Sequence, residues 1–104
     1  MTITEADLPS IVATARKNLG MTAAEFDREL ATGASSTKAS YDSPRGEICN
    51  EIYWRATLPL RDAQGGLTVS VDEAKKVGFG AVKALHDAIG RLEQDALARR
   101  NGRA

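Results

Sequence analysis

Two side chains of this sequence could serve as a nucleophile and a general base: Cys49, the single cysteine, and His86, the single histidine. A thiol enzyme needs a base beside its thiol and a third group that orients the base. Nothing in the spacing of Cys49 and His86 brings the two side chains together. We therefore expect Cys49 to be a small buried hydrophobe and His86 to be a half-exposed helix residue.

The sequence also gives little indication of a metal site or of a phosphate-binding loop. A zinc site built from one cysteine, one histidine and carboxylates would be sparse. Phosphate-binding loops place glycines between a strand and a helix, whereas Gly65-Gly66 is predicted in a turn and Gly78 and Gly80 in a helix. The sequence therefore predicts a protein that is not an enzyme and uses neither a metal nor a cofactor.

Side chains of the types that dominate protein–protein contacts gather near the middle of the chain, at Tyr53, Trp54, Arg55 and Arg61. If these residues lie on a β-strand, alternation directs Trp54 toward the core and Tyr53, Arg55 and Arg61 outward. We therefore predict that Tyr53, Arg55 and Arg61 bind a partner protein. The competing interpretation is an ordinary solvated strand face.

The strand prediction comes from apolar residues at every second position between residues 52 and 71. Such alternation is typical of a strand with one buried face. Residues 61–66 interrupt the pattern, and their Asp and Gly side chains suit a tight turn. We expect an antiparallel β-hairpin over residues 51–71. The alternating apolar residues are Ile52, Trp54, Ala56, Leu58, Leu60, Leu67, Val69 and Val71.

The first third of the chain carries helical spacing and capping signals instead. Thr22 and Glu25 have the spacing of a capping box at a helix start. Gly20 suits the left-handed position that ends a helix, and Gly33 ends the apolar face of the second helix. These signals predict a helical hairpin over residues 7–33.

A long amphipathic helix is predicted over residues 72–99, with Ser70 and Glu73 in capping-box spacing at its start. Its large apolar side chains recur at the a and d positions of a helix–helix seam. A lone two-stranded sheet also has two free edges and is marginally stable. Both observations predict a homo-oligomer. The predicted self-association residues are Val82, Leu85, Ile89 and Leu92.

Composition places the chain among small globular proteins. Its 104 residues have room for one domain with a modest core. Fourteen basic side chains balance fourteen acidic ones, which gives little long-range attraction to nucleic acid or anionic lipid. A single cysteine excludes an internal disulfide and favours a reducing compartment. Because the sequence lacks a signal peptide and an apolar run of about 20 residues, we expect a cytoplasmic location and no membrane contact.

Residues 16–26 read Arg-Lys-Asn-Leu-Gly-Met-Thr-Ala-Ala-Glu-Phe. This run resembles the first two helices of the phage-repressor type of helix-turn-helix, in which a basic helix end, Leu-Gly and a capped second helix recur. The resemblance implies a DNA-binding transcriptional regulator, with Arg16, Lys17 and Lys38 as candidate DNA contacts. Apart from Lys38, however, residues 34–40 hold small side chains where the recognition helix of that family has its apolar anchors.

These features predict a single α+β domain with two N-terminal helices, an antiparallel β-hairpin and a long C-terminal amphipathic helix. The leading functional hypothesis is a non-enzymatic protein–protein interaction module, such as an adaptor, an inhibitor or an assembly factor, that self-associates. The alternative is the DNA-binding regulator. The predicted segments are a helical hairpin (7–33), a loop (34–43), a stretch that fits either helix or strand (44–51), a β-hairpin (51–71) and a long helix (72–99).

Overall fold

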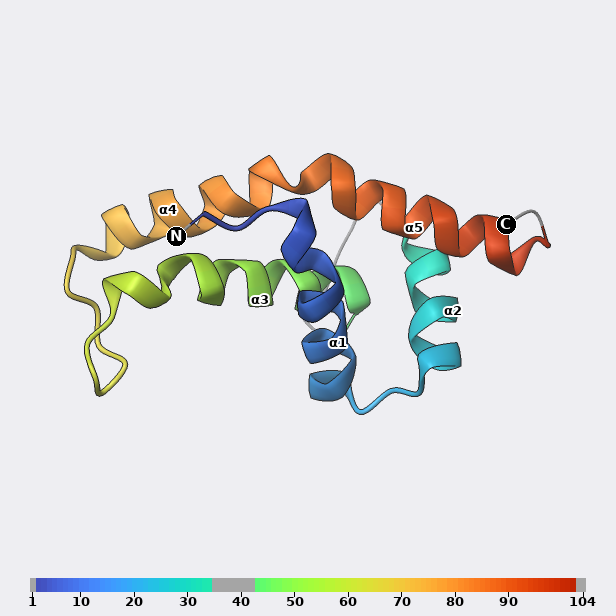
Figure 1. Ribbon diagram of the computed structural model, residues 1–104, viewed down its shortest axis with the longest axis horizontal. Coiled ribbons are helices and arrows are strands. Elements are labelled where there is room, and N and C mark those ends of the chain that lie inside the picture. Colours follow the sequence, from blue (N-terminus) through green and yellow to red (C-terminus); the bar gives the residue numbers. More distant parts are fainter. Residues whose placement is uncertain (1, 35–42, 103–104) are drawn as a thin grey trace.

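The chain folds into an elongated arrangement of helices with principal extents of 47, 25 and 24 Å (Figure 1). The computed structural model describes residues 2–34 and 43–102, and within these ranges there are five α-helices and two short 3-10 helices. In chain order the elements are η1 Glu5–Asp7, α1 Leu8–Leu19, α2 Ala23–Gly33, α3 Pro44–Thr57, η2 Leu58–Leu60, α4 Val71–Ala84 and α5 His86–Arg100.

The α+β prediction is wrong, because residues 2–34 and 43–102 contain helices and no β-strand. The predicted β-hairpin over residues 51–71 is replaced by the end of α3, η2 and a turn. The period-2 pattern was ambiguous because it also places apolar residues four positions apart. Ile52 and Ala56 lie one helical turn apart on the buried side, and Trp54 and Leu58 do so on the exposed side.

The start of α3 shows why a helix forms where the alternation indicated a strand. The Ser43 Oγ accepts a hydrogen bond from the backbone N–H of Gly46 at 3.1 Å, which caps the first turn. Pro44 occupies that first turn, where its missing N–H costs no hydrogen bond. The stretch that fitted either helix or strand, residues 44–51, is therefore helical.

Only the turn of the predicted β-hairpin is present. The Asp62 Oδ1 accepts hydrogen bonds from the backbone N–H groups of Gln64 and Gly66, at 3.0 and 2.9 Å. A single antiparallel bridge joins Arg61 to Leu67. Among the described residues no β-ladder continues from this bridge, because η2 ends just before the turn and α4 begins soon after it.

The helices α1 and α2 occupy the region predicted as a helical hairpin. Gly20 follows α1 in the left-handed conformation, with φ 66°. At the start of α2, the Thr22 Oγ1 accepts a hydrogen bond from the Glu25 N–H at 3.1 Å, and the Glu25 carboxylate accepts one from the Thr22 N–H at 3.0 Å. The predicted capping box is confirmed. Its hydrogen bond from the Thr22 backbone lowers the pKa of Glu25.

The helices α4 and α5 replace the single helix predicted over residues 72–99. Ser70 caps α4, its Oγ accepting a hydrogen bond from the Glu73 N–H at 3.1 Å. The helix is interrupted at Leu85, where φ is −102° and ψ is 6°, while the Leu85 side chain stays buried. In Figure 1 the two helices still follow nearly one line along the upper edge of the molecule.

The core is shared by α1, α2, α3 and α5, which we call the body. In the body α2 packs against α5, and both α1 and α2 pack against α3. The largest fully buried apolar side chains of this core include Ile11, Ile48 and Ile52. The helix α4 differs because it packs mainly against α3. We call residues 53–84 the arm; it comprises the last turns of α3, η2, the turn and α4, and forms the left-hand part of Figure 1.

A partly buried ion pair ties three helices of the body together. The Arg45 Nε and Nη2 of α3 donate to the two carboxylate oxygens of Glu93 on α5, at 2.8 and 3.0 Å. Arg45 also donates to the backbone carbonyl of Gly33 at the end of α2. Glu93 is only 4% exposed, so this arginine supplies the charge and the hydrogen bonds that its carboxylate loses by leaving water.

The two glycines of α4 have different environments. Gly78 is buried against the Tyr53 ring of α3, and a Cβ at this position would overlap that ring. Gly80 is exposed, and a Cβ there would meet nothing within 4 Å. Gly78 therefore permits the close approach of α3 and α4, whereas Gly80 leaves an open stretch of backbone on the outside of the arm.

Candidate functional site

Large apolar side chains that remain exposed are confined to the arm. Among the described residues, five large hydrophobic side chains are exposed, and all of them lie between residues 54 and 79. Scattered single hydrophobics are normal on a protein surface, but here all five fall within one stretch of the chain, on α3, η2 and α4. We call these five the apolar arm residues: Trp54, Leu58, Val71, Val77 and Phe79.

Arg61, which the sequence indicated as a partner-binding residue, lies beside Trp54, which was predicted in the core. Trp54 is 48% exposed, and the guanidinium of Arg61 lies over its ring, with the Cζ atom 4.1 Å from the ring centroid. The Arg61 Nη1 also donates to the carbonyl of Gly65 in the turn, at 3.1 Å. Arg61, one of the predicted partner-binding residues, is thus held beside an exposed aromatic ring.

The structure reverses the predicted orientations of Tyr53 and Trp54. Tyr53 points at α4, where its ring contacts Gly78 and its centroid lies 5.1 Å from that of Phe79. Trp54, predicted in the core, is exposed instead. The reason is the helix: successive side chains are about 100° apart on a helix and 180° apart on a strand, so neighbouring residues of α3 fan out toward different surroundings.

Arg55, the third predicted partner-binding residue, is used within the protomer. Its Nε donates to the Glu51 carboxylate at 2.7 Å, and its Nη2 reaches the hydroxyl groups of Ser10 and Thr14 on α1, at 3.1 and 3.2 Å. These bonds join α3 to α1. Arg55 therefore helps to position the arm on the body and offers little of its guanidinium to a partner.

Phe79 is an exposed aromatic residue that the sequence did not single out. It is 60% exposed, the second most exposed of the apolar arm residues. A signal was available, because helical spacing places Phe79 on the same side of α4 as Asp72, Lys76 and Lys83. A large aromatic on the charged side of an amphipathic helix does not enter the core, so a partly exposed ring was to be expected there; in the structure it lies beside the Tyr53 ring.

The predicted self-association residues lie elsewhere, in and around the body core. Leu85 and Ile89 are each 4% exposed and belong to the body core, and Val82 and Leu92 are partly buried against it. Their heptad spacing serves helix packing inside one protomer, since α2 packs against α5 and Leu85 and Ile89 share one core cluster with side chains of α1, α2 and α3. This seam is not free to bind a second chain.

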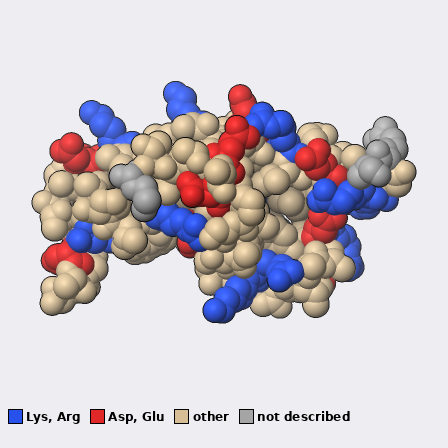
Figure 2. Space-filling view, viewed as in Figure 1, with Lys and Arg blue, Asp and Glu red and all other residues tan. Residues whose placement is uncertain are grey.

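Charge is mixed over the surface. Figure 2 shows acidic and basic side chains interspersed on the visible face. On α4 the acidic residues come first and the basic residues follow: the exposed charged side chains in chain order are Asp72, Glu73, Lys75, Lys76 and Lys83. A partner would therefore be selected by local contacts rather than by a field of one sign.

A groove of about 700 Å³ adjoins the arm, and its lining includes Cys49 and His86. The structure thus brings the two residues to one groove, but among the described residues no hydrogen bond joins them. The His86 Nδ1 lies 3.6 Å from the Asp87 Oδ1, and both side chains are exposed. Burial raises the pKa of the Cys49 thiol, which disfavours the thiolate. This pair does not have the arrangement of an activated nucleophile.

Cys49 is accordingly expected to react slowly with iodoacetamide. The thiolate is the reactive form, and a raised pKa shifts its appearance to higher pH. The alkylation rate in the folded protein is expected to lie below that of a free cysteine between about pH 7 and 9, to rise with pH, and to increase on unfolding in urea. Mass spectrometry of timed samples measures it. A fast rate at neutral pH would contradict the protonated thiol.

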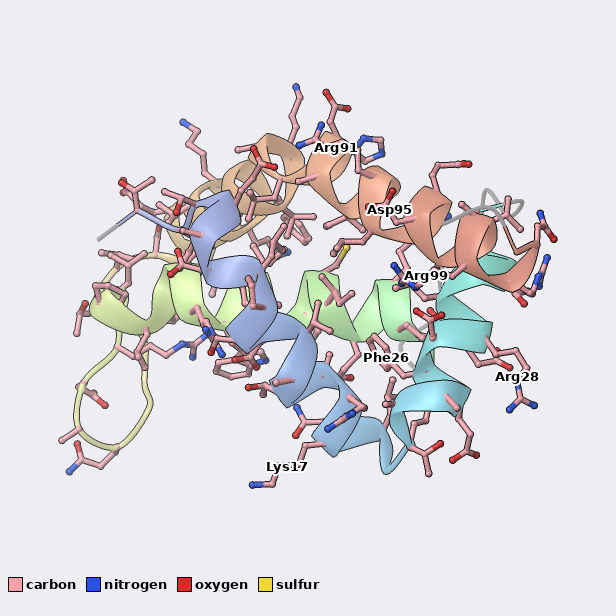
Figure 3. All side chains as sticks on the ribbon, turned by 45° about the vertical axis from the view of Figure 1, so that its right-hand side comes forward. Lys17, Phe26, Arg28, Arg91, Asp95 and Arg99 are labelled. Carbon is pink, nitrogen blue, oxygen red and sulfur yellow. The ribbon has the colours of Figure 1, made fainter. Side chains whose placement is uncertain are left out.

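The candidate DNA contacts are distributed as follows. Arg16 and Lys17 are exposed at the C-terminal end of α1, and Lys17 projects away from the body in Figure 3. Lys38 lies outside the described residues. The next helix among the described residues, α3, is flanked by α1, α2 and α4, with Ile48 and Ile52 fully buried. It is not presented to solvent as a recognition helix has to be.

Two further properties hold for the residues that the structure describes. No group of three or more His, Cys, Asp and Glu side chains is placed to hold a metal ion. No helix has both the length and the apolar character needed to cross a bilayer. Compared with family models, curated proteins and solved structures, the chain matches none.

Proposed function

We propose that this chain is a non-catalytic protein–protein interaction module that binds another protein chain through its arm. The observation that carries the proposal is the confinement of the five exposed large hydrophobic side chains to residues 54–79. Protein contact surfaces combine such an apolar centre with a polar rim. The exposed acids and lysines of α4 supply that rim.

The residue types of the arm support the same proposal. Tryptophan, tyrosine and arginine carry a large share of binding energy in protein interfaces. Trp54 and Arg61 are already stacked on one another, so little side-chain freedom remains to be lost on binding. The Phe79 ring packs beside the Tyr53 ring in a tilted arrangement, which also restricts its side chain. The arm therefore presents two partly ordered aromatic anchors.

Lysine acetylation tests this surface directly. The arm carries Lys75, Lys76 and Lys83, whereas Lys17 lies on α1. The purified chain at high dilution and an extract of the cells that make it are treated with the same acetylating reagent. We expect the three arm lysines to be protected in the extract relative to the dilute chain, while Lys17 reacts equally in both. Peptide mass spectrometry gives the extent of acetylation at each site.

Two variants make the result specific. Phe79→Ser is expected to abolish the protection of the arm lysines, and Gln94→Ser, an exposed change on α5, is expected to leave it intact. Equal acetylation of the arm lysines in both samples would contradict the proposal. Protection of Lys17 alone, lost after nuclease treatment, would favour the DNA-binding alternative in its place.

A further inference from the structure

One side of α4 carries side chains that are exposed, although the Phe79 ring among them also lies beside the Tyr53 ring of α3. Four exposed residues recur along it at intervals of four, three and four, which keeps them on one side of the helix. This side lies roughly opposite the buried Ala74 and Gly78. We call the four residues the outer strip: Asp72, Lys76, Phe79 and Lys83.

The outer strip is complementary in charge to a second outer strip that runs antiparallel to it. Asp72 stands at its start and Lys83 at its end, so in two antiparallel α4 helices each Asp72 meets a Lys83. In two antiparallel helices, the numbers of facing residues have a constant sum. Asp72 and Lys83 have the same sum as Lys76 and Phe79, so the register that pairs the first two also places each Phe79 beside Lys76 of the other helix. An ammonium group beside an aromatic ring is itself attractive.

From this arrangement we infer that the outer strip binds the outer strip of a second copy of this chain, with the two α4 helices antiparallel about a two-fold axis. The inference rests on the proposed function and names its partner. A two-fold contact requires a self-complementary surface, and the order of charges along α4 provides one. Gly80 lies beside the strip with open space above its backbone, so a second helix can approach closely.

The dimer is expected to be weak and sensitive to salt. One helix crossing with a single large aromatic per chain falls at the small end of protein interfaces. Its charge pairs are exposed and therefore screened by salt. Sedimentation velocity over a range of concentrations is expected to show the apparent mass rising toward twice the monomer mass, and the rise is expected to shrink when sodium chloride is added.

Charge reversal provides the decisive test. Asp72→Lys and Lys83→Asp each place like charges at both symmetry-related contacts, and each alone is expected to weaken the dimer by about tenfold. An equimolar mixture of the two variants forms a heterodimer in which both contacts are again oppositely charged, so dimerisation is expected to return. The double variant Asp72→Lys/Lys83→Asp is also expected to dimerise. A loss of folding in either variant would not be repaired by mixing, and circular dichroism checks it.

The outcomes separate this inference from the proposed function. A chain that stays monomeric up to about 1 mM, or reversed-charge variants that do not recover on mixing, would overturn the antiparallel dimer. If the arm lysines are nevertheless protected in the cell extract, the proposed function stands with a different protein as the partner. If the dilute chain, the concentrated chain and the extract all show equal acetylation, both are wrong.

Discussion

Replacing Arg45 by methionine is expected to lower the free energy of unfolding by about 3 kcal/mol at neutral pH, the lower end of the range for breaking a buried ion pair. Its guanidinium is the partner of a carboxylate that is 4% exposed and also binds the Gly33 carbonyl. Without it, the charge of Glu93 stays buried without compensation. Urea unfolding followed by circular dichroism measures the change.

Two controls distinguish the ion pair from a general effect of losing an arginine. Arg91 on α5 also pairs with an acid, Glu5, but both side chains are more than half exposed, so Arg91→Met is expected to cost well under about 1 kcal/mol. The double variant Arg45→Met/Glu93→Met removes both charges and is expected to recover most of the loss. If Arg45→Met and Arg91→Met cost the same, the burial argument is wrong.

Replacing a glycine of α4 by alanine is expected to change the stability of the protein in opposite directions at Gly78 and Gly80. Gly78→Ala forces a Cβ into the Tyr53 ring, and such overpacking costs about 1–3 kcal/mol. Gly80→Ala meets open space and gains up to about 1 kcal/mol of helix propensity. Thermal and urea unfolding of the two variants measure the contrast.

The Tyr53 ring is the reason for the cost at residue 78, and a second substitution tests this. In a Tyr53→Leu background the clash is reduced, so Gly78→Ala is expected to cost less than it does in the natural chain. The effect of Gly80→Ala is expected to be the same in both backgrounds. An unchanged penalty at Gly78 without the ring would show that α3 and α4 do not meet as described.

Capping signals in the sequence predicted local structure correctly where they depend on a few neighbouring residues. The box formed by Thr22 and Glu25 and the cap at Ser70 are present as hydrogen bonds. The β-hairpin prediction failed because alternation over residues 52–60 satisfies a helix as well as a strand. The cap at Ser43, outside the alternating run, favours the helix.

The candidate site was harder to predict because it depends on orientation and on long-range packing. Whether Trp54 faces the core or solvent follows from the type of element, so one wrong assignment inverted its position relative to Tyr53. Val82, Leu85, Ile89 and Leu92 do have heptad spacing, but spacing alone does not say whether other helices of the same protomer or a second chain will cover these residues.

The single tryptophan gives the chain its own optical reporter at the proposed contact. Trp54 is the only indole in the sequence, it is half exposed, and a guanidinium lies across its ring. Indole emission responds to water and to nearby charge. A partner that binds at this part of the molecule is therefore expected to change the emission wavelength or the quantum yield of its intrinsic fluorescence, and no label is needed.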